Sequence, residues 1–272
     1  MRINFEPYIP EQIIDYFEPI SGLTAQIIGN YLLYVNGETL VMIGYPINGE
    51  YDEKEVAQIL QRHLEEKRKR RIVVIAPKLP SSLAFEEVRT DKYYRLTLPI
   101  KHLGKKIRYM VSRASRELNI EVGRSLTKSH RELMRDFLKR PDVEEFMEHV
   151  CSRLEYYLSK SKTVEIINAF AKNGRLVGFD VVDLPRGKYS FYMFNFIDRR
   201  EGYVPGVSDL MLYHFLKISE EEGKLYVNMG LGINEGVKRF KIKWGAEAFL
   251  PYEYGVVKRS DISKVFEVFS KL

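Results

Sequence analysis

The chain is short of cysteine: Cys151 is the only one among 272 residues. One cysteine cannot form an intramolecular disulfide, nor a zinc site built from cysteine pairs. Long apolar runs are missing too, and none approaches the ~20 residues that a membrane-spanning helix needs. The first residues, MRINFEPYIPEQ, carry acids and prolines where a secretory signal needs an apolar stretch. These absences predict a soluble cytoplasmic protein, with a peripheral position at a membrane left open.

Sequence motifs for metal binding and nucleophilic catalysis are also absent. The chain has five histidines, and neither His130 nor His149 has metal-ligand spacing to an acid or to Cys151. No Ser-His-Asp or Cys-His arrangement is recognisable. Cys151 follows a valine in an apolar pattern, which favours packing over a nucleophilic role. The sequence therefore predicts no metal site and identifies no catalytic nucleophile.

What the chain does contain is typical of a globular protein of one large domain or two of ordinary size. Hydrophobic residues make up 45% and charged residues 29%, with 18 Tyr and 15 Phe. Lys and Arg exceed Asp and Glu by 43 to 37, and the pI is about 9.1. This modest excess favours anionic partners without identifying them.

Turn residues and periodicity predict the main elements. Residues 32–46 read as a hairpin with Asn36-Gly37 as a type I′ turn, and residues 164–198 as a three-stranded meander. Ser208 and Asp209 are expected to cap the helix that follows. A further helical pattern follows from Lys101, with Ile107, Val111, Ala114 and Leu118 on one face.

The charges on the opposite face of that helix are nearly all positive and come chiefly from Lys105, Arg108 and Arg116. A helix that only needs solubility usually mixes in acids at i,i+4 spacing, and this one does not. Two interpretations stay open: an ordinary solvated face, or a surface for a polyanion.

Two loops are candidate anion sites. The first, residues 198–208, enters a helix N-terminus, where free N–H groups can hold a phosphate, although it could also be a surface loop with a Pro-Gly turn. Its candidates are Arg199, Arg200, Gly202, Gly206 and Ser208. The second, residues 226–247, combines Gly230, Gly232 and Gly236 with four cations. An extended segment would place Arg239, Lys241 and Lys243 on one face, beside a cleft where neighbouring strands separate.

The order of meander, glycine loop, helix and strand resembles the GNAT (acyl-CoA N-acyltransferase) fold. Arg199-Arg200-Glu201-Gly202-Tyr203-Val204 is similar to the pyrophosphate loop of that fold, but Val204 replaces a small residue, which counts against classical acetyl-CoA binding. Gly104-Lys105-Lys106, Asn228-Met229-Gly230 and Phe240-Lys241-x-x-x-Gly245 resemble tandem-GNAT proteins: Fem-type aminoacyltransferases and the C-terminal domain of phosphatidylglycerol lysyltransferases.

The resemblance implies an α+β fold of two GNAT-like halves with mixed, mainly antiparallel sheets flanked by helices. The halves are expected at residues 1–150, which is degenerate, and 151–272, which carries the donor site. The implied donor is acyl-CoA or aminoacyl-tRNA, and the acceptor is an amine or hydroxyl of a small molecule or lipid. Implied partners are tRNA or an anionic lipid head group. Asn228, Gly230, Asn234, Arg239 and Lys243 are expected to bind substrate or anion.

Three classes of function remain open: an acyl- or aminoacyltransferase, a non-catalytic module that binds RNA or another anion, and a structural partner in a complex. For the enzyme, Lys241 and Asp198 are the catalytic candidates, while Asp209, Glu235 and His214 are other possible proton acceptors. Lys241 is expected to reach an anionic group from a cleft. Its replacement is therefore expected to impair function and to leave stability almost unchanged.

Overall fold

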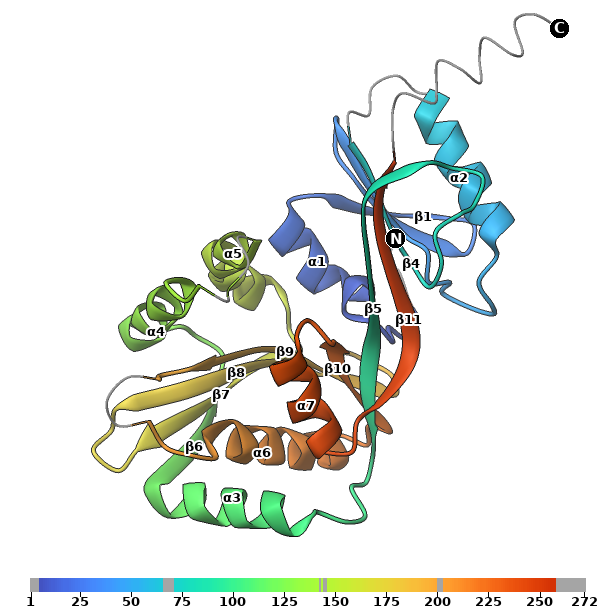
Figure 1. Cartoon of the computed structure of the whole chain (residues 1–272). Coiled ribbons are helices and arrows are strands. Elements are labelled where there is room, and N and C mark those ends of the chain that lie inside the picture. Colours follow the sequence, from blue (N-terminus) through green and yellow to red (C-terminus); the bar gives the residue numbers. More distant parts are fainter. Residues whose placement is uncertain (1–4, 66–70, 142, 144–145, 200–202, 258–272) are drawn as a thin grey trace, which may run out of the picture. The chain divides into compact units, whose positions relative to one another are not determined.

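The computed structural model describes residues 5–65, 71–141, 143, 146–199 and 203–257 (Figure 1). These residues form seven α-helices, one short 3-10 helix and eleven strands. No helix among them is both long enough and apolar enough to cross a membrane.

The chain divides into two compact units, each assembled from two separate segments. The larger unit comprises Met1–Ile20 and Tyr94–Glu247, and the smaller comprises Ser21–Tyr93 with Ala248–Leu272. This division differs from the expected halves 1–150 and 151–272. The expected boundary falls inside a helix, and strands β5 (Phe85–Thr97) and β11 (Glu247–Val257) each continue from one unit into the other. Whether each expected half is a GNAT-like repeat stays a prediction.

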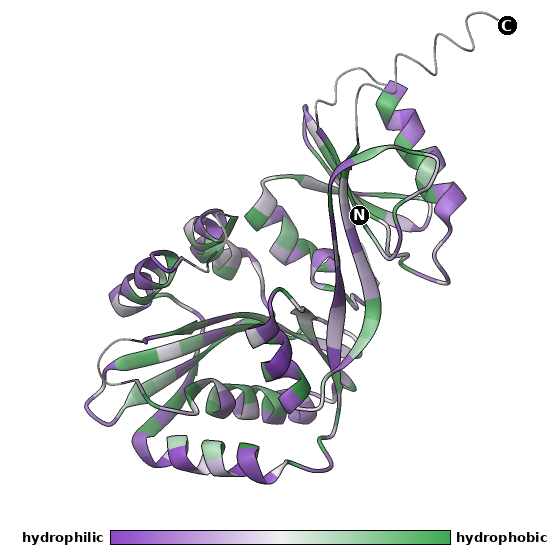
Figure 2. Ribbon diagram, in the orientation of Figure 1, coloured by the Kyte–Doolittle hydropathy of each residue, from purple (hydrophilic) through white to green (hydrophobic). Residues whose placement is uncertain are grey.

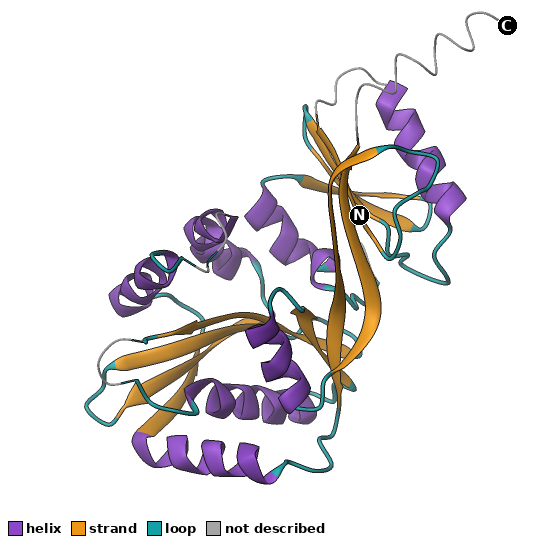
Figure 3. Cartoon of the chain, viewed as in Figure 1, coloured by secondary structure: helices purple, strands orange, loops and turns teal. Residues whose placement is uncertain are grey.

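The larger unit is built on the strand order β5-β10-β9-β8-β7-β6. Figure 3 shows the strands of the chain in orange and its helices in purple. Strands β6 to β9 pair antiparallel, and β10 pairs parallel with β9. Its elements, besides β5, are η1 (Pro10–Gln12), α1 (Ile14–Ser21), α3 (Lys105–Glu117), β6 (Leu118–Gly123), α4 (Lys128–Leu138), α5 (Phe146–Lys160), β7 (Val164–Ala171), β8 (Leu176–Asp183), β9 (Tyr189–Ile197), α6 (Val207–Glu221), β10 (Tyr226–Leu231) and α7 (Glu235–Lys243).

Helices cover both faces of this sheet. Helices α3 and α6 lie together on one face, and α4 and α5 lie on the other (Figure 1). One apolar cluster joins α3 and α6 to the sheet around Met211 and Phe215, and a second joins α4 and α5 around Phe179 and Phe196. Strand β8 is therefore buried along its whole length. The predicted meander is confirmed by the pairing of β7, β8 and β9.

The smaller unit has its own apolar core beneath one helix. Its strands follow the order β1-β2-β3-β4-β11-β5, with β3 and β4 parallel. Its remaining elements are β1 (Thr24–Ile28), β2 (Tyr31–Val35), β3 (Thr39–Ile43), α2 (Glu53–Glu65) and β4 (Arg71–Ala76). The predicted α+β class, with mixed and mainly antiparallel strands flanked by helices, is confirmed in both units.

The hairpin between β2 and β3 is present, but its predicted type I′ turn is wrong. Strand β2 ends at Val35 and β3 begins at Thr39, so three residues form the connection, and Gly37 does not adopt a positive φ. The Asn36 side chain instead accepts hydrogen bonds from the N–H groups of Glu38 (2.9 Å) and Thr39 (2.7 Å). Side-chain bonding of this kind stabilises a longer loop than the sequence pattern suggests.

A buried histidine ties α4 to the sheet and makes the stability of the fold depend on pH. His130 Nδ1 accepts a hydrogen bond from the Thr127 N–H (3.1 Å), and His130 Nε2 lies 2.6 Å from Asn168 Oδ1. These partners fix a neutral imidazole with its proton on Nε2. Burial lowers the pKa of His130, and the positive charge of Arg131 lowers it further, while the hydrogen bond that His130 donates to Asn168 raises it.

Because the pKa of His130 is lower in the folded chain, the unfolded chain binds more protons just below pH 6.5. The contribution of His130 to stability is present at neutral pH and should be lost on acidification, with a limiting slope of about 1.4 kcal/mol per pH unit. Urea unfolding at pH 5 to 7.5 measures it, because His130→Gln should lose this part of the pH dependence. Parallel profiles for the two proteins would contradict the assignment.

Candidate functional site

The sheet of the larger unit separates where β9 and β10 stop pairing. Their pairing covers three residues and ends at Asn228 opposite Phe191, although both strands continue. Beyond that point β9 carries a bulge: Phe194 pairs with Val181 and Tyr192 with Val182, so Met193 has no partner on β8. A bulge bends its strand and increases the local twist. The separation of neighbouring strands that the sequence suggested therefore lies next to Asn228.

Helix α6 begins beside this bend. Gly206 is its N-cap, with φ 92°, and provides no side chain to cap the first turn. A Cβ at Gly206 would lie 2.6 Å from the Met110 carbonyl oxygen of α3, so only glycine fits here. The predicted cap at Ser208 and Asp209 is wrong, because the left-handed Gly206 lets the helix start earlier. The N–H groups of Ser208 and Asp209 consequently lie in an uncapped first turn, which suits an anion.

A buried polar network lies between this first turn and the sheet. Asp180 of β8 accepts hydrogen bonds at Oδ1 from Asn195 Nδ2 (2.6 Å) and the Tyr192 hydroxyl (3.1 Å). Ser208 Oγ in turn donates to Asn195 Oδ1 (3.3 Å). Asp180, Tyr192 and Asn195 were not among the residues predicted from the sequence. The available signal was a carboxylate within the apolar strand Gly-Phe-Asp-Val-Val, which a buried strand rarely carries unless the carboxylate is partnered.

The electrostatics of Asp180 are unusual. Its side chain is 0% exposed, and Oδ2 has no hydrogen-bond partner among the described residues. Burial raises its pKa to about 8, although the hydrogen bonds from Asn195 and Tyr192 act in the opposite direction. Burial therefore favours the neutral carboxylic acid form of Asp180 over its carboxylate.

A second set of contacts joins α6 to α7. The carboxylate of Asp209 accepts a hydrogen bond from Trp244 Nε1 (2.8 Å) and forms an ion pair with Lys243. Both partners come from the end of α7, so this contact fixes α7 against the first turn of α6 (Figure 1). The negative charge of Asp209 is compensated, and Lys243 brings a cation beside the candidate anion site.

The expected extended segment carrying Arg239, Lys241 and Lys243 is wrong, because these residues lie in helix α7. The Asn234 side chain accepts a hydrogen bond from the Val237 N–H (3.0 Å) and so caps this helix. The three cations point to different partners as a result. Arg239 Nε bonds to the Glu235 carbonyl of its own helix at 3.1 Å, and Lys243 pairs with Asp209.

Lys241 is buried, with 4% of its surface exposed. Its ammonium group donates to the Leu231 carbonyl and lies 6.0 Å from the centre of the Tyr94 ring. Gly230 lies next to it and adopts a positive φ of 73°, a conformation that favours glycine. These contacts hold the end of β10 against α7, which gives Lys241 a structural role; its catalytic role stays a prediction.

The other predicted residues are spread around this region. Asn228 is buried and donates to the Tyr8 carbonyl (2.8 Å), while its Oδ1 accepts the Gly230 N–H (2.7 Å). Asp198 is buried and pairs with Arg175 at 2.7 Å, so its charge is already compensated. Arg199 is exposed, and Arg200 and Gly202 lie outside the described residues. The structure thus brings Gly206, Ser208 and Lys243 together and uses Asn228 and Asn234 for local structure.

The other candidate proton acceptors have ordinary structural surroundings. His214 is half-buried, and burial lowers its pKa. Glu235 is exposed and lies 3.5 Å from Lys238. Burial raises the pKa of Cys151 to about 11, which agrees with packing rather than nucleophilic chemistry. Among the described residues, no group of three His, Cys, Asp or Glu side chains could hold a metal ion.

The basic face of α3 is confirmed as an exposed surface. Ile107 and Ala114 are buried against α6, while Lys105, Arg108 and Arg116 are exposed, and the helix is largely hydrophilic in Figure 2. Within the described part of the chain, the side chains of these three cations form no hydrogen bond or ion pair. Tyr109 lies among them and is 59% exposed.

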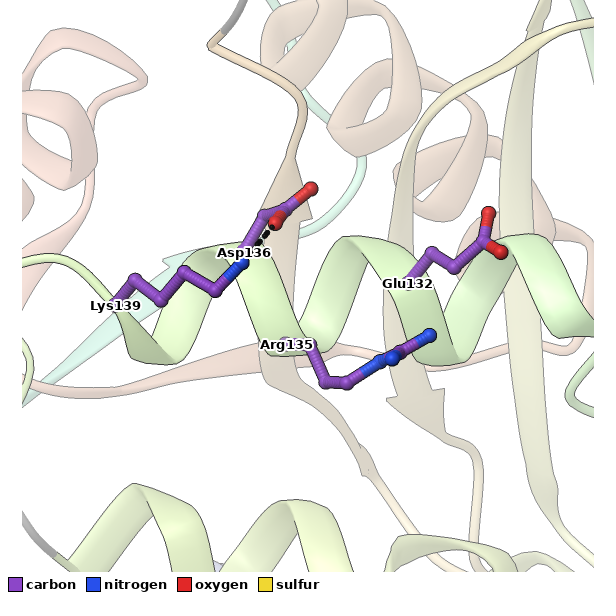
Figure 4. A pocket seen from close by; sticks show the side chains of 4 residues that line it. All are labelled: Glu132, Arg135, Asp136 and Lys139. Atoms are coloured by element: carbon purple, nitrogen blue, oxygen red, sulfur yellow. Dashed lines mark hydrogen bonds and ion pairs between the residues drawn. The ribbon is translucent and has the colours of Figure 1, made fainter.

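Helix α4 differs from α3, because its cations are paired as on an ordinary solvated helix surface. Two of its cations and the C-cap residue Lys139 pair with acids: Lys128 with Glu132 (3.8 Å), Arg131 with Glu155 (2.8 Å) and Lys139 with Asp136 (3.0 Å). A shallow hollow of about 230 Å³ lies on the same helix, lined by Glu132, Arg135, Asp136 and Lys139 (Figure 4). Two acids and two bases from one helix form a solvated surface, not a site with a distinctive chemistry.

The fold is that of the GNAT proteins. FemX is similar over 97% of this chain and 96% of its own, at 12% identity and a TM-score of 0.63. The C-terminal domain of a putative lysylphosphatidylglycerol synthetase from Agrobacterium fabrum matches 91% of this chain and 88% of its own (13% identity, TM-score 0.56). A tandem GNAT protein from the clavulanic acid biosynthesis pathway matches 84% and 78% (12% identity, TM-score 0.55).

No family model matches the sequence, and no curated protein matches it. The structural matches therefore define the fold class, and the predicted GNAT-fold relationship to Fem-type and lysylphosphatidylglycerol synthetase proteins is confirmed at that level.

Proposed function

We propose that the protein is a GNAT-fold acyltransferase whose donor is held at the first turn of α6. The observation that carries this proposal is the uncapped start of α6 beside the point where β9 and β10 separate. The N–H groups of Ser208 and Asp209 suit a phosphate or pyrophosphate, and the nearby charge of Asp209 is compensated by its ion pair with Lys243. Both acyl-CoA and aminoacyl-tRNA present such groups. The donor residues thus fit either molecule, and the acceptor is an amine or hydroxyl.

In this reaction the acceptor attacks the donor's acyl carbonyl, the bond from that carbonyl to the donor's sulfur or oxygen breaks, and the acceptor loses a proton. The roles proposed for this chain are binding and orientation. The start of α6 is proposed to hold the anionic part of the donor, and the acyl arm is proposed to lie beside the bend in β9, next to β10. Asp198 remains a proposed proton acceptor, and Lys241 a proposed catalytic cation.

A transfer assay tests the proposal with two labelled donors, acetyl-CoA and a pool of aminoacyl-tRNA, offered to mixed amines and phospholipids. Ser208→Asp places a negative charge in the first turn of α6, where it favours the helix dipole but repels a donor phosphate. We expect at least a tenfold loss of kcat/KM, because repulsion between the new carboxylate and a donor phosphate in the same helix turn costs on the order of 1–2 kcal/mol.

Ser152→Asp, on the exposed surface of α5, changes the net charge equally and should leave transfer unchanged. If the protein transfers a label from either donor and Ser208→Asp does not slow that transfer, the proposed position of the site is wrong. If the protein transfers neither label, the proposal that it is an acyltransferase is wrong.

One observation favours a second candidate, a non-catalytic module that binds RNA or another anionic partner. The exposed cations of α3 have no acidic partners among the described residues, whereas two cations of α4 and its C-cap residue Lys139 do. An unpaired basic face is what a polyanion needs. Polyanion binding without transfer of either label would favour this candidate.

A further inference from the structure

The buried acid Asp180 lies two hydrogen bonds from the first turn of α6. Its Oδ1 is bonded to Asn195 Nδ2, and Asn195 Oδ1 accepts from Ser208 Oγ in that turn. Its Oδ2 is buried and unpartnered among the described residues. The ring of Tyr192, which also donates to Asp180, stacks on Phe215 of α6 at 6.1 Å. The acid therefore lies on the side of β8 that faces α6.

The charged and titratable groups around Asp180 leave its own charge uncompensated. Strand β9 contributes the Tyr192 hydroxyl, whose pKa is raised by burial and by Asp180. Helix α6 contributes Asp209, and α7 contributes Lys243, but these two are paired with each other. No cation contacts Asp180 among the described residues. An ionised Asp180 would thus place a negative charge beneath the helix terminus that is proposed to attract the donor's anion.

We propose that binding of the donor's anionic group at the first turn of α6 is coupled to protonation of Asp180. This inference rests on the proposed function, because it takes the start of α6 as the donor site. With Asp180 neutral, the positive potential of the helix terminus is available to the phosphate. With Asp180 ionised, two negative charges share a region of low dielectric, and binding weakens.

The sign follows from linkage. Burial raises the pKa of Asp180 to about 8 in the free protein, and a bound anion raises it further. Binding therefore takes up protons around pH 8, and donor affinity falls as the pH rises through this value. Asp180→Asn has the same shape and remains neutral, and its amide oxygen can keep the hydrogen bonds from Asn195 and Tyr192.

The test is isothermal titration of the intact wild-type chain and of Asp180→Asn with coenzyme A, and separately with bulk uncharged tRNA, from pH 6.5 to 9.5. For the probe that carries the donor group, wild-type affinity should fall on the order of tenfold between pH 7 and 9.5. The affinity of Asp180→Asn should stay level over the same range. At pH 8, buffers of different ionisation enthalpy should reveal proton uptake by the wild type and much less by the variant.

The outcomes separate the two proposals. Binding of coenzyme A or tRNA with the same pH profile in both proteins overturns the coupling and leaves the donor site standing. The absence of binding by either probe at every pH overturns the donor site, and the coupling with it. A pH-dependent loss of affinity for coenzyme A would assign the anionic group to a CoA pyrophosphate, and the same loss for tRNA would assign it to an RNA phosphate. If Asp180→Asn does not fold, proton uptake by the wild type alone decides, and zero uptake overturns the coupling.

Discussion

Replacing Lys105, Arg108 and Arg116 of α3 together by Gln should weaken polyanion binding on the order of a hundredfold at 0.1 M salt. Each lost phosphate contact removes about 0.7 to 0.9 from the slope of log K against log salt, so the slope should fall by roughly 2 to 3. The physical reason is that these cations are exposed and have no acidic partner among the described residues. Fluorescence anisotropy with bulk tRNA at several salt concentrations measures both quantities, and sedimentation with anionic vesicles does the same for lipids.

Helix α4 supplies the matched control. Replacing Lys128, Arg131 and Lys139 by Gln changes the net charge by the same amount, but these cations are already paired with acids. This control should lose little affinity and keep most of the slope. Equal losses in the two triple variants would show that net charge alone governs binding. An unchanged affinity in the α3 variant for both tRNA and anionic vesicles would return this face to an ordinary solvated surface.

Lys241→Met should destabilise the larger unit by about 1–3 kcal/mol, because it removes a charged hydrogen bond and leaves a carbonyl without its partner. The lysine is 4% exposed, and its ammonium group donates to the Leu231 carbonyl. This expectation corrects the one made from the sequence, in which replacing Lys241 would leave stability unchanged. Urea unfolding at pH 7 measures the difference in free energy of unfolding.

Lys238→Met is the control on the same helix. The side chain of Lys238 is 43% exposed, and its only ion-pair partner in the described part of the chain is Glu235 at 3.5 Å, so a change of less than about 0.5 kcal/mol is expected. Similar stability of the two variants would contradict the structural role of Lys241. If Lys241→Met in addition lowers kcat by more than its unfolded fraction explains, the catalytic role proposed for this lysine gains support.

The strands and the basic helix could be predicted because their signals are local. Gly174 and Gly187 adopt the positive φ that the meander's turns need, and the register of β7, β8 and β9 follows. The spacing of Ile107 and Ala114 defines the buried face of α3 without reference to the rest of the chain. Such patterns depend on neighbours within a few residues, which the sequence displays directly.

Features decided by distant contacts could not be read in this way. Glycine-rich residues 230–236 favour an extended or irregular segment, but the Asn234 cap and the contact of Trp244 with Asp209 stabilise helix α7. The N-cap of α6 is Gly206 and not the predicted Ser208 or Asp209, and Gly206 lies so close to the Met110 carbonyl oxygen that no Cβ fits there. The environment of Asp180 could not be predicted, because its partners Tyr192 and Asn195, and Ser208 beyond Asn195, are brought to it by the fold.

Hydrogen–deuterium exchange of the wild-type chain, with and without saturating donor, tests the central claim most directly. If the first turn of α6 holds the donor's anionic group, peptides covering residues 203–210 should exchange more slowly in the presence of coenzyme A or of tRNA, because their N–H groups become hydrogen-bonded. The basic face of α3 should gain protection only with tRNA if it is an RNA surface. Donor binding that leaves residues 203–210 unprotected and slows exchange elsewhere in the chain would contradict the account.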